Sequence, residues 1–205
     1  MGVSYSSSML QFWFDFASTY SYLAAMRVEE LAGAARVALA WRPFLLGPIF
    51  AEEGMNDSPF NLFPRRGAYM WREMERFSAA YGIRFRRPTV FPRNSVLAAR
   101  VAWLGVDETW GSGYVRAVYT ANFAEDRDIA AAEVLGEILT DLGQDAAARL
   151  AATQAPANRA RLRGATETAR ALGIFGAPSF IAGDELFFGN DRLEAALRHL
   201  TAGAQ

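Results

Sequence analysis

The stretch L-Q-F-W-F-D-F-A-S-T-Y-S-Y-L-A, residues 10–24, passes from a strand pattern to a helix pattern within one turn. Its first seven residues are rich in aromatic side chains and partly alternate, which is typical of a β-strand. Ser18 and Thr19 favour the start of a helix, and apolar residues then recur at helical spacing as far as Gly33. Residues 37–42 alternate again, so the sequence predicts a strand–helix–strand unit.

Strand character returns near the C-terminus. Residues 179–182 and 185–188 flank the turn Gly183-Asp184, which indicates a hairpin, and a final helix is expected over 192–200. Between the two halves, an irregular segment at 43–64 is rich in Gly, Pro and Asn, and the rest of the stretch shows helical patterns only. Helices are expected there at 68–81, 94–104, 113–124, 131–142, 145–153 and 156–172.

This order matches an α/β protein with a thioredoxin fold whose two halves are separated by an inserted all-helical domain. Residues 10–45 and 164–203 are expected to form the thioredoxin-like domain, and residues 46–163 the inserted helical domain. The strands of both halves are expected to share one sheet, although a long helical stretch separates them in the sequence.

The composition excludes several kinds of chemistry. The 205 residues include no Cys and a single His, His199, and all 21 basic residues are Arg. Disulfides, Cys nucleophiles, Schiff-base lysines and a P-loop lysine are therefore impossible on this chain, and no metal site is expected. A net charge of −1 gives no reason to expect nucleic acid or an anionic membrane as a partner. Most of the chemistries that remain need a bound cofactor.

The N-terminal region carries no pattern of a targeting signal. Residues 1–8 are polar without a basic cluster, and the apolar run at 9–16 is interrupted by Gln11 and Asp15. That run is too short and too polar for a signal peptide or a transmembrane helix, so a soluble, cytoplasmic protein is expected.

The turn between the first strand and the first helix is the first candidate site, and it reads Ala17-Ser18-Thr19-Tyr20. The unpaired N–H groups of a helix start favour an anion, and a serine hydroxyl can donate a hydrogen bond to a thiolate that a ligand supplies. Ser18 also fits an ordinary N-cap, and the position alone leaves both interpretations open.

Two further segments frame the same site in such a fold. Gly176-Ala177-Pro178-Ser179 precedes the third strand, where a cis proline faces the first-helix turn and leaves the backbone N–H and C=O of Ala177 free for a peptide-like ligand. Residues 188–191, Phe-Gly-Asn-Asp, form either a turn with a helix cap or a segment that holds the charged ends of an amino-acid-like group.

Three motifs that occur in order resemble the 2-hydroxychromene-2-carboxylate isomerase family: F-D-F-A-S-T-Y-S-Y-L-A (14–24), F-G-A-P-S-F (175–180) and F-G-N-D-R-L (188–193). That family is close to kappa-class glutathione transferases, within the DsbA-like branch of the thioredoxin superfamily. The middle of the chain is also similar, at W-R-P-F-L-L-G-P-I-F (41–50), S-P-F-N-L-F-P-R-R-G-A-Y-M (58–70), F-P-R-N-S (91–95) and R-D-I (127–129).

The resemblance implies a bound glutathione as the cofactor, with its sulfur at Ser18 as the catalytic residue. It implies that Ala177, beside Pro178, pairs with the cysteinyl part of the tripeptide. The γ-glutamyl end is then held by Phe188, Gly189, Asn190 and Asp191, with Asp191 as the partner of the ammonium group. The candidate substrate contacts are Asn61, Arg66 and Asn94, although both asparagines also fit hydrogen bonds that order a loop.

The reaction implied by the resemblance is the interconversion of 2-hydroxychromene-2-carboxylate and trans-o-hydroxybenzylidenepyruvate-type aromatic substrates. Two alternatives are a kappa-like glutathione transferase acting on electrophiles and a non-catalytic thioredoxin-fold binding protein. Relatives are often dimers, so a homodimer is a further expectation. An apolar pocket for a small aromatic substrate is expected from Trp13, Tyr20, Tyr22, Phe44, Phe60 and Phe188.

Two positions depart from the family pattern. Ala51 stands where family members often have Lys, and Arg66 replaces the Lys of a Pro-x-Lys-Gly pattern. Arg keeps the positive charge but presents a different geometry to a carboxylate. Both replacements therefore concern the contact to the substrate carboxylate.

Overall fold

The computed structural model describes residues 9–202, and its sheet is built from both ends of that range. The strands are β1 (Met9–Phe14), β2 (Ala38–Pro43), β3 (Ser179–Ala182) and β4 (Glu185–Phe188), in the order β2-β1-β3-β4. β1 pairs with β2 in parallel and with β3 antiparallel, and β3 pairs with β4 antiparallel. The predicted single sheet is confirmed. The expectation for residues 1–8, and residue 203 of the predicted thioredoxin-like domain, lie outside the described residues.

The sheet is held by an aromatic core on β1. The Phe12 ring stacks on Phe180 of β3 at 5.5 Å between centroids and meets Trp41 of β2 edge-on at 5.3 Å. Helices α1 (Thr19–Ala25) and α2 (Val28–Ala34) connect β1 to β2, while α11 (Leu193–Ala202) follows the short η1 (Asn190–Arg192) and contacts β1, β3, β4 and α2. Central aromatic residues therefore bind the two halves of the chain together.

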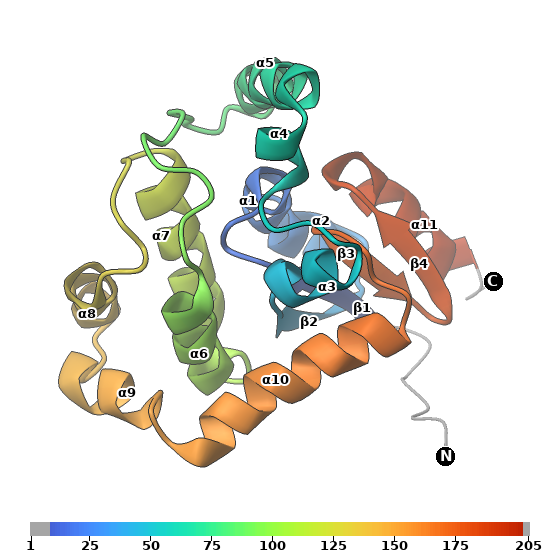
Figure 1. Ribbon diagram of the computed structural model, residues 1–205. Coiled ribbons are helices and arrows are strands. Elements are labelled where there is room, and N and C mark those ends of the chain that lie inside the picture. The colour runs from blue at the N-terminus through green and yellow to red at the C-terminus, as the bar shows by residue number, and fades with distance from the viewer. Residues whose placement is uncertain (1–8, 203–205) are drawn as a thin grey trace.

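Eight helices lie between β2 and β3 in the chain. Figure 1 shows α6–α9 gathered on one side of the sheet, α4 and α5 above it, and α10 running back toward β3. Their bounds are α3 (Leu46–Glu52), α4 (Pro59–Leu62), α5 (Pro64–Tyr81), α6 (Val96–Gly105), α7 (Gly111–Phe123), α8 (Ala132–Asp141), α9 (Ala146–Ala152) and α10 (Pro156–Ala171). Within residues 9–202, none of the helices combines the length and apolar character that crossing a membrane requires.

Buried hydrogen bonds attach the helical stretch to the end of β1. The Tyr119 hydroxyl on α7 donates to the Asp15 carbonyl at 2.9 Å, and the Asn122 side chain donates to the Phe16 carbonyl at 3.0 Å. The division into two domains stays a prediction. Its boundary between residues 163 and 164 falls inside α10, which is one continuous helix that also contacts β2.

Three local expectations were wrong. The first strand ends at Phe14 instead of Phe16, because Asp15 turns into the loop. The expected helix to Gly33 is two helices with a break at residues 26–27, where the Arg27 side chain lies over the Tyr81 ring. The expected irregular segment at 43–64 contains α3 and α4, because a proline in the first turn of a helix costs no hydrogen bond.

Candidate functional site

Ser18 combines the two roles that the sequence left open. Its side-chain oxygen accepts the Ser21 N–H at 3.2 Å, so it is the N-cap of α1. The same hydroxyl donates its hydrogen to the Ala177 carbonyl oxygen at 2.7 Å. Ser18 is 9% exposed and lies in a cavity wall.

The Ala177–Pro178 segment faces Ser18 from the start of β3. The peptide bond between these two residues is cis, as expected for a thioredoxin fold at this position. The Ser179 hydroxyl donates to the Gly176 carbonyl at 2.8 Å, and the Gly189 N–H donates to the Pro178 carbonyl at 3.0 Å. These bonds fix the backbone of Ala177 against the Ser18 turn and bring the 188–191 segment alongside.

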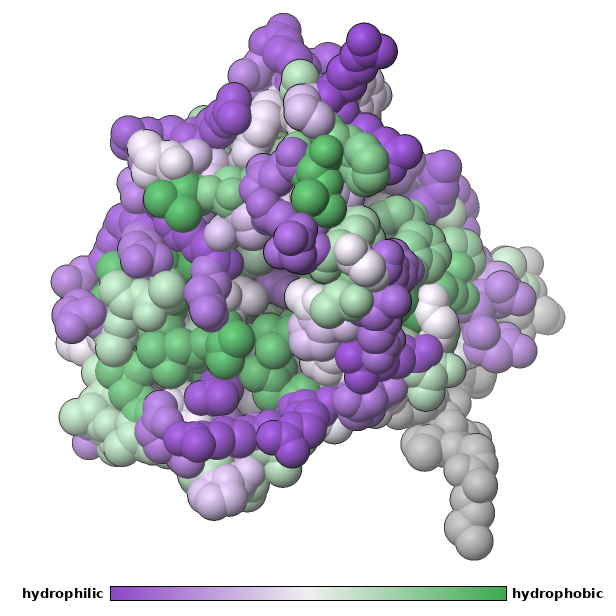
Figure 2. Space-filling view, viewed as in Figure 1, coloured by the Kyte–Doolittle hydropathy of each residue, from purple (hydrophilic) through white to green (hydrophobic). Residues whose placement is uncertain are grey.

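A cavity of about 820 Å³ opens beside these residues. This volume lies toward the upper end of the range of roughly 300–1,000 Å³ typical of small-molecule sites. Its walls come from the Ser18 turn, α3, the segment leading into α4, the loop before α6 and the Phe175–Ala177 segment. Figure 2 shows the surface recessed between α3 and α6, with apolar side chains around it. The site can therefore hold a ligand larger than a single amino acid.

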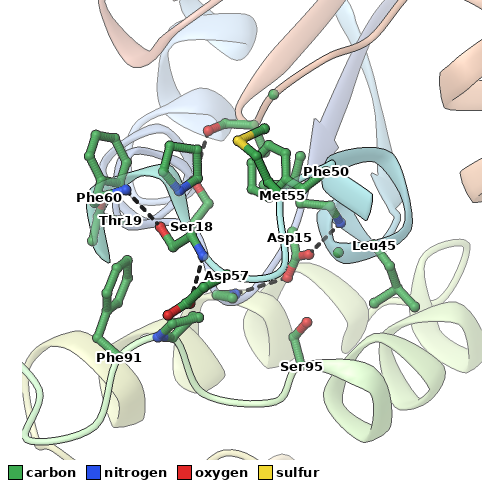
Figure 3. A pocket seen from close by; sticks show the side chains of 18 of the residues that line it. Asp15, Ser18, Thr19, Leu45, Phe50, Met55, Asp57, Phe60, Phe91 and Ser95 are labelled. Atoms are coloured by element: carbon green, nitrogen blue, oxygen red, sulfur yellow. Dashed lines mark hydrogen bonds between the residues drawn. The ribbon is translucent and has the colours of Figure 1, made fainter. Parts of the chain in front are cut away.

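Asp15 is a functional candidate that the sequence reading missed. Its carboxylate accepts the Ala17 N–H at 2.9 Å and the Leu46 N–H at 2.8 Å, and these bonds are drawn in Figure 3. The side chain lines the cavity wall, yet the residue is only 3% exposed, and burial raises the pKa of the carboxyl above its usual value. A charged residue inside the apolar run F-W-F-D-F was the available signal.

Tyr20 extends the Ser18 turn along the cavity. Its hydroxyl donates to the Glu73 carboxylate at 2.5 Å, and its ring lies 6.0 Å from that of Phe60. Burial, followed by the effect of Glu73, raises the pKa of Tyr20 well above its usual value. The Tyr20 phenol is therefore neutral near pH 7 and contributes an aromatic surface to the cavity.

Half of the expected aromatic residues line the cavity. Tyr20, Phe60 and Phe188 do so, whereas Trp13, Tyr22 and Phe44 are buried outside it. The sequence could not separate the two groups, because core and pocket aromatics follow the same apolar pattern. Phe50, Phe63, Phe91 and Phe175 line the cavity and were not among the expected residues.

Two of the three candidate substrate contacts line the cavity, and the third lies outside its wall. Arg66 and Asn94 line the cavity, and Arg66 lies over the Phe63 ring at 4.6 Å. The Asn94 side chain also accepts the Val96 N–H at 2.9 Å. The Asn61 side chain is outside the cavity wall and bonds to the Phe91 carbonyl at 3.0 Å and to Asp57, so it orders the loop.

The 188–191 segment contributes unequally to the cavity. Phe188 lines it, whereas Gly189, Asn190 and Asp191 are not part of its wall. Asn190 is 2% exposed, and its side chain lies within hydrogen-bond range of Arg27 and Tyr81. The assignment of this segment to a γ-glutamyl group stays a prediction.

The positive charge in the cavity wall is limited. Of its two arginines, Arg93 is buried and bonded to Asp126 at 2.5 Å, while Arg66 is exposed. Ala51 also lines the wall and adds no charge to it. Among residues 9–202, no cluster of three or more His, Asp or Glu side chains is arranged to hold a metal ion.

Comparisons with known proteins agree with this fold. The chain is 29% identical over 187 residues to a 2-hydroxychromene-2-carboxylate isomerase from Sphingobium xenophagum, which is 90% of this chain and 94% of that protein. A solved structure of a 2-hydroxychromene-2-carboxylate isomerase aligns with a TM-score of 0.84 at 27% identity, over 96% of this chain and 97% of the other. The cytosolic disulfide reductase DsbM from Pseudomonas aeruginosa, solved with GSH, aligns with a TM-score of 0.65 at 15% identity, over 96% of each chain.

The match to a family extends over nearly the whole described range. Residues 9–201 match the DSBA-like thioredoxin domain, and this range includes the Ser18 turn, the helical stretch and the Ala177 segment. The α/β architecture expected from the sequence, a thioredoxin fold, is thereby confirmed. The chain belongs to the family of DsbA-like thioredoxin domains.

Proposed function

We propose that the protein is a glutathione-dependent isomerase that interconverts 2-hydroxychromene-2-carboxylate and its trans-o-hydroxybenzylidenepyruvate-type isomer. The observation that carries the proposal is the Ser18 hydroxyl, placed 2.7 Å from the Ala177 carbonyl on the wall of an apolar cavity. The similarity to proteins named 2-hydroxychromene-2-carboxylate isomerase, which extends over 90% of the chain, supports the reaction class.

The residues around Ser18 fit a bound glutathione. The site offers a hydroxyl donor for a thiolate, a backbone carbonyl for a peptide N–H, and a cavity of about 820 Å³. The chain has no cysteine, so a reactive sulfur at this turn comes from a ligand. DsbM, which has the same fold, was solved with GSH. Ser18, Ala177, Pro178 and the 188–191 segment are the residues proposed to hold the tripeptide.

The chain's residues stabilise charge and orient the reactants. Glutathione, when bound, supplies a thiolate that adds reversibly to a conjugated carbonyl compound. The Ser18 hydroxyl stabilises the negative charge on sulfur and is not itself a covalent nucleophile. Tyr20, Phe60 and Phe188 offer aromatic faces to a bicyclic substrate, and Arg66 is the exposed cation available for its carboxylate.

The proposal is tested by the turnover of Ser18→Ala with glutathione and 2-hydroxychromene-2-carboxylate. Loss of one pre-positioned donor is expected to lower kcat by about 10²- to 10³-fold while the fold stays intact. Ser78→Ala, which removes a buried hydroxyl outside the cavity wall, is the matched control and is expected to keep the wild-type rate. Equal rates in wild type and Ser18→Ala would contradict the proposal.

Product analysis separates the related activities. An isomerase returns glutathione unchanged, whereas a kappa-like transferase forms a product that retains it, and a binding protein forms no product. The proposed partners are a small aromatic substrate and a second copy of the chain, in a soluble cytoplasmic protein. Light scattering of the purified protein tests the proposed homodimer.

A further inference from the structure

The Ser18 hydroxyl donates its hydrogen to the Ala177 carbonyl, whereas the proposed chemistry needs that hydrogen at the thiolate sulfur. A serine hydroxyl has a single hydrogen, and here it is donated to the Ala177 carbonyl oxygen at 2.7 Å. The Ser21 N–H uses the lone pairs of the Ser18 oxygen at 3.2 Å and does not compete for that hydrogen. A thiolate beside Ser18 therefore gains the hydroxyl hydrogen only when the hydroxyl leaves Ala177.

The Ala177 carbonyl is poorly placed to lose its donor. Ala177 is 7% exposed, so water has little access to it while the hydroxyl is in place. A buried carbonyl without a partner costs about as much as a lost hydrogen bond. Release of the Ser18 hydroxyl is therefore favourable only when an arriving ligand brings its own N–H to the Ala177 oxygen.

We infer that the Ala177 carbonyl determines which thiols the site activates. A ligand with an amide N–H on the carbon next to the CH2–SH group places that N–H on the Ala177 oxygen and frees the Ser18 hydroxyl for the sulfur. The inference rests on the proposed function and names its thiol class: N-acylated cysteine compounds, as in a γ-glutamyl peptide, in preference to simple alkyl thiols. The exchange breaks one hydrogen bond, forms two with the ligand, and changes no covalent bond.

A sulfur-free tripeptide isolates the exchange. γ-Glutamyl-alanyl-glycine keeps the amide N–H but has no thiolate to receive the Ser18 hydroxyl. In wild type its N–H must displace that hydroxyl, whereas in Ser18→Ala the Ala177 carbonyl is free. Calorimetry is expected to show that the tripeptide binds Ser18→Ala roughly two- to tenfold more tightly than wild type, because wild type loses one net hydrogen bond on binding. Glutathione, above the pKa of its thiol, is expected to show the opposite order and bind wild type more tightly.

Two controls isolate the role of the carbonyl. The same sulfur-free tripeptide, methylated on the alanyl amide nitrogen, has no N–H to place on Ala177 and is expected to bind wild type and Ser18→Ala equally. Ser95→Ala removes another hydroxyl of the cavity wall and is expected to leave the order of the tripeptide affinities unchanged.

A second measurement uses wild type alone. The thiolate absorbance is expected to show a lower thiol pKa for bound glutathione than for its analogue methylated on the cysteinyl amide nitrogen.

The possible failures point to different conclusions. Equal or weaker binding of the sulfur-free tripeptide by Ser18→Ala would overturn the exchange and leave glutathione binding intact. Equal thiol pKa values for the two bound thiols in wild type would also overturn it, even if Ser18→Ala does not fold. Failure of glutathione itself to bind wild type at millimolar concentration would overturn the proposed function, and this inference with it.

Discussion

Asp15 accepts the backbone N–H of Leu46 at 2.8 Å and thereby joins the end of β1 to the first residue of α3. Its other carboxylate oxygen accepts the Ala17 N–H at 2.9 Å, one residue before Ser18. One buried side chain thus connects the Ser18 turn to the opposite cavity wall. Figure 3 shows Ser95 facing this carboxylate from the loop before α6.

The buried Asp15 charge predicts a falling contribution to stability as pH rises. Burial raises its pKa in the folded state, so the folded protein retains the proton that the unfolded chain loses near pH 4. The free energy of unfolding of wild type, measured with urea, is therefore expected to fall relative to that of Asp15→Asn between pH 4 and pH 7. The same measurement on Asp141→Asn, at the exposed end of α8, is the matched control for the loss of one carboxylate. A free energy of unfolding of wild type that stays constant or rises relative to that of Asp15→Asn over this pH range would contradict the interpretation.

Arg66 and its neighbour Arg65 provide a test of the substrate carboxylate contact. Both are exposed on α5, but only Arg66 lines the main cavity. Arg66→Met is expected to raise the KM for an aromatic carboxylate about two- to fivefold, a modest effect because solvent screens the contact. Arg65→Met changes the net charge equally and is expected to leave KM unchanged. Equal effects of the two substitutions would indicate a general charge effect instead of a contact.

Gly176 leaves room for the Phe188 ring at the cavity mouth. A Cβ at position 176 would lie 2.5 Å from that ring, which packs against Phe175 at 4.7 Å between centroids. Phe188 is 44% exposed, so it can move at little cost to the fold. Gly176→Ala is therefore expected to change stability by less than about 0.5 kcal/mol.

The same substitution is expected to weaken binding of an aromatic ligand. Displacing the Phe188 ring removes aromatic contact, which is worth about two- to tenfold in affinity. Gly164→Ala on α10, where a Cβ meets nothing within 4 Å, is the matched control for affinity. Fluorescence titration compares the two variants, and unchanged affinity in Gly176→Ala would show that Phe188 does not contact the ligand.

Local signals in the sequence predicted the sheet well. The hairpin at 179–182 and 185–188 was predicted with its observed bounds, because the turn Gly183-Asp184 and the flanking apolar residues specify it within ten residues. The Ser18 turn was also visible, since a cap residue must follow directly on the strand. That Ala177 lies across from Ser18 came from the overall order of elements and not from any local pattern.

Other features of the site depend on contacts between distant residues. The role of Asp15 requires the Leu46 N–H, which is 31 residues away, so no spacing in the sequence reveals it. Helix α3 was read as a loop because Gly47 and Pro48 usually interrupt helices, yet both lie in its first turn. Asn61 was a candidate contact because the family resemblance implied it, but its side chain bonds to the Phe91 carbonyl instead.

Asp126 predicts a pH dependence opposite to that of Asp15. Hydrogen bonds from the Thr89 N–H and from the Arg93 guanidinium lower the pKa of Asp126 to about 2. The folded state therefore stays ionised where the unfolded chain takes up a proton, and the stability it contributes is present above pH 4 and lost as pH falls toward 2.

Asp126→Asn tests this in acid. Asn tolerates the left-handed backbone found at position 126, where φ is 58°, so the loop is expected to keep its shape. The difference in the free energy of unfolding between wild type and Asp126→Asn is expected to shrink from pH 5 to pH 2. A constant difference for Asp126→Asn would mean that its carboxylate is not held ionised by Thr89 and Arg93, and that this loop is maintained by its backbone conformation alone.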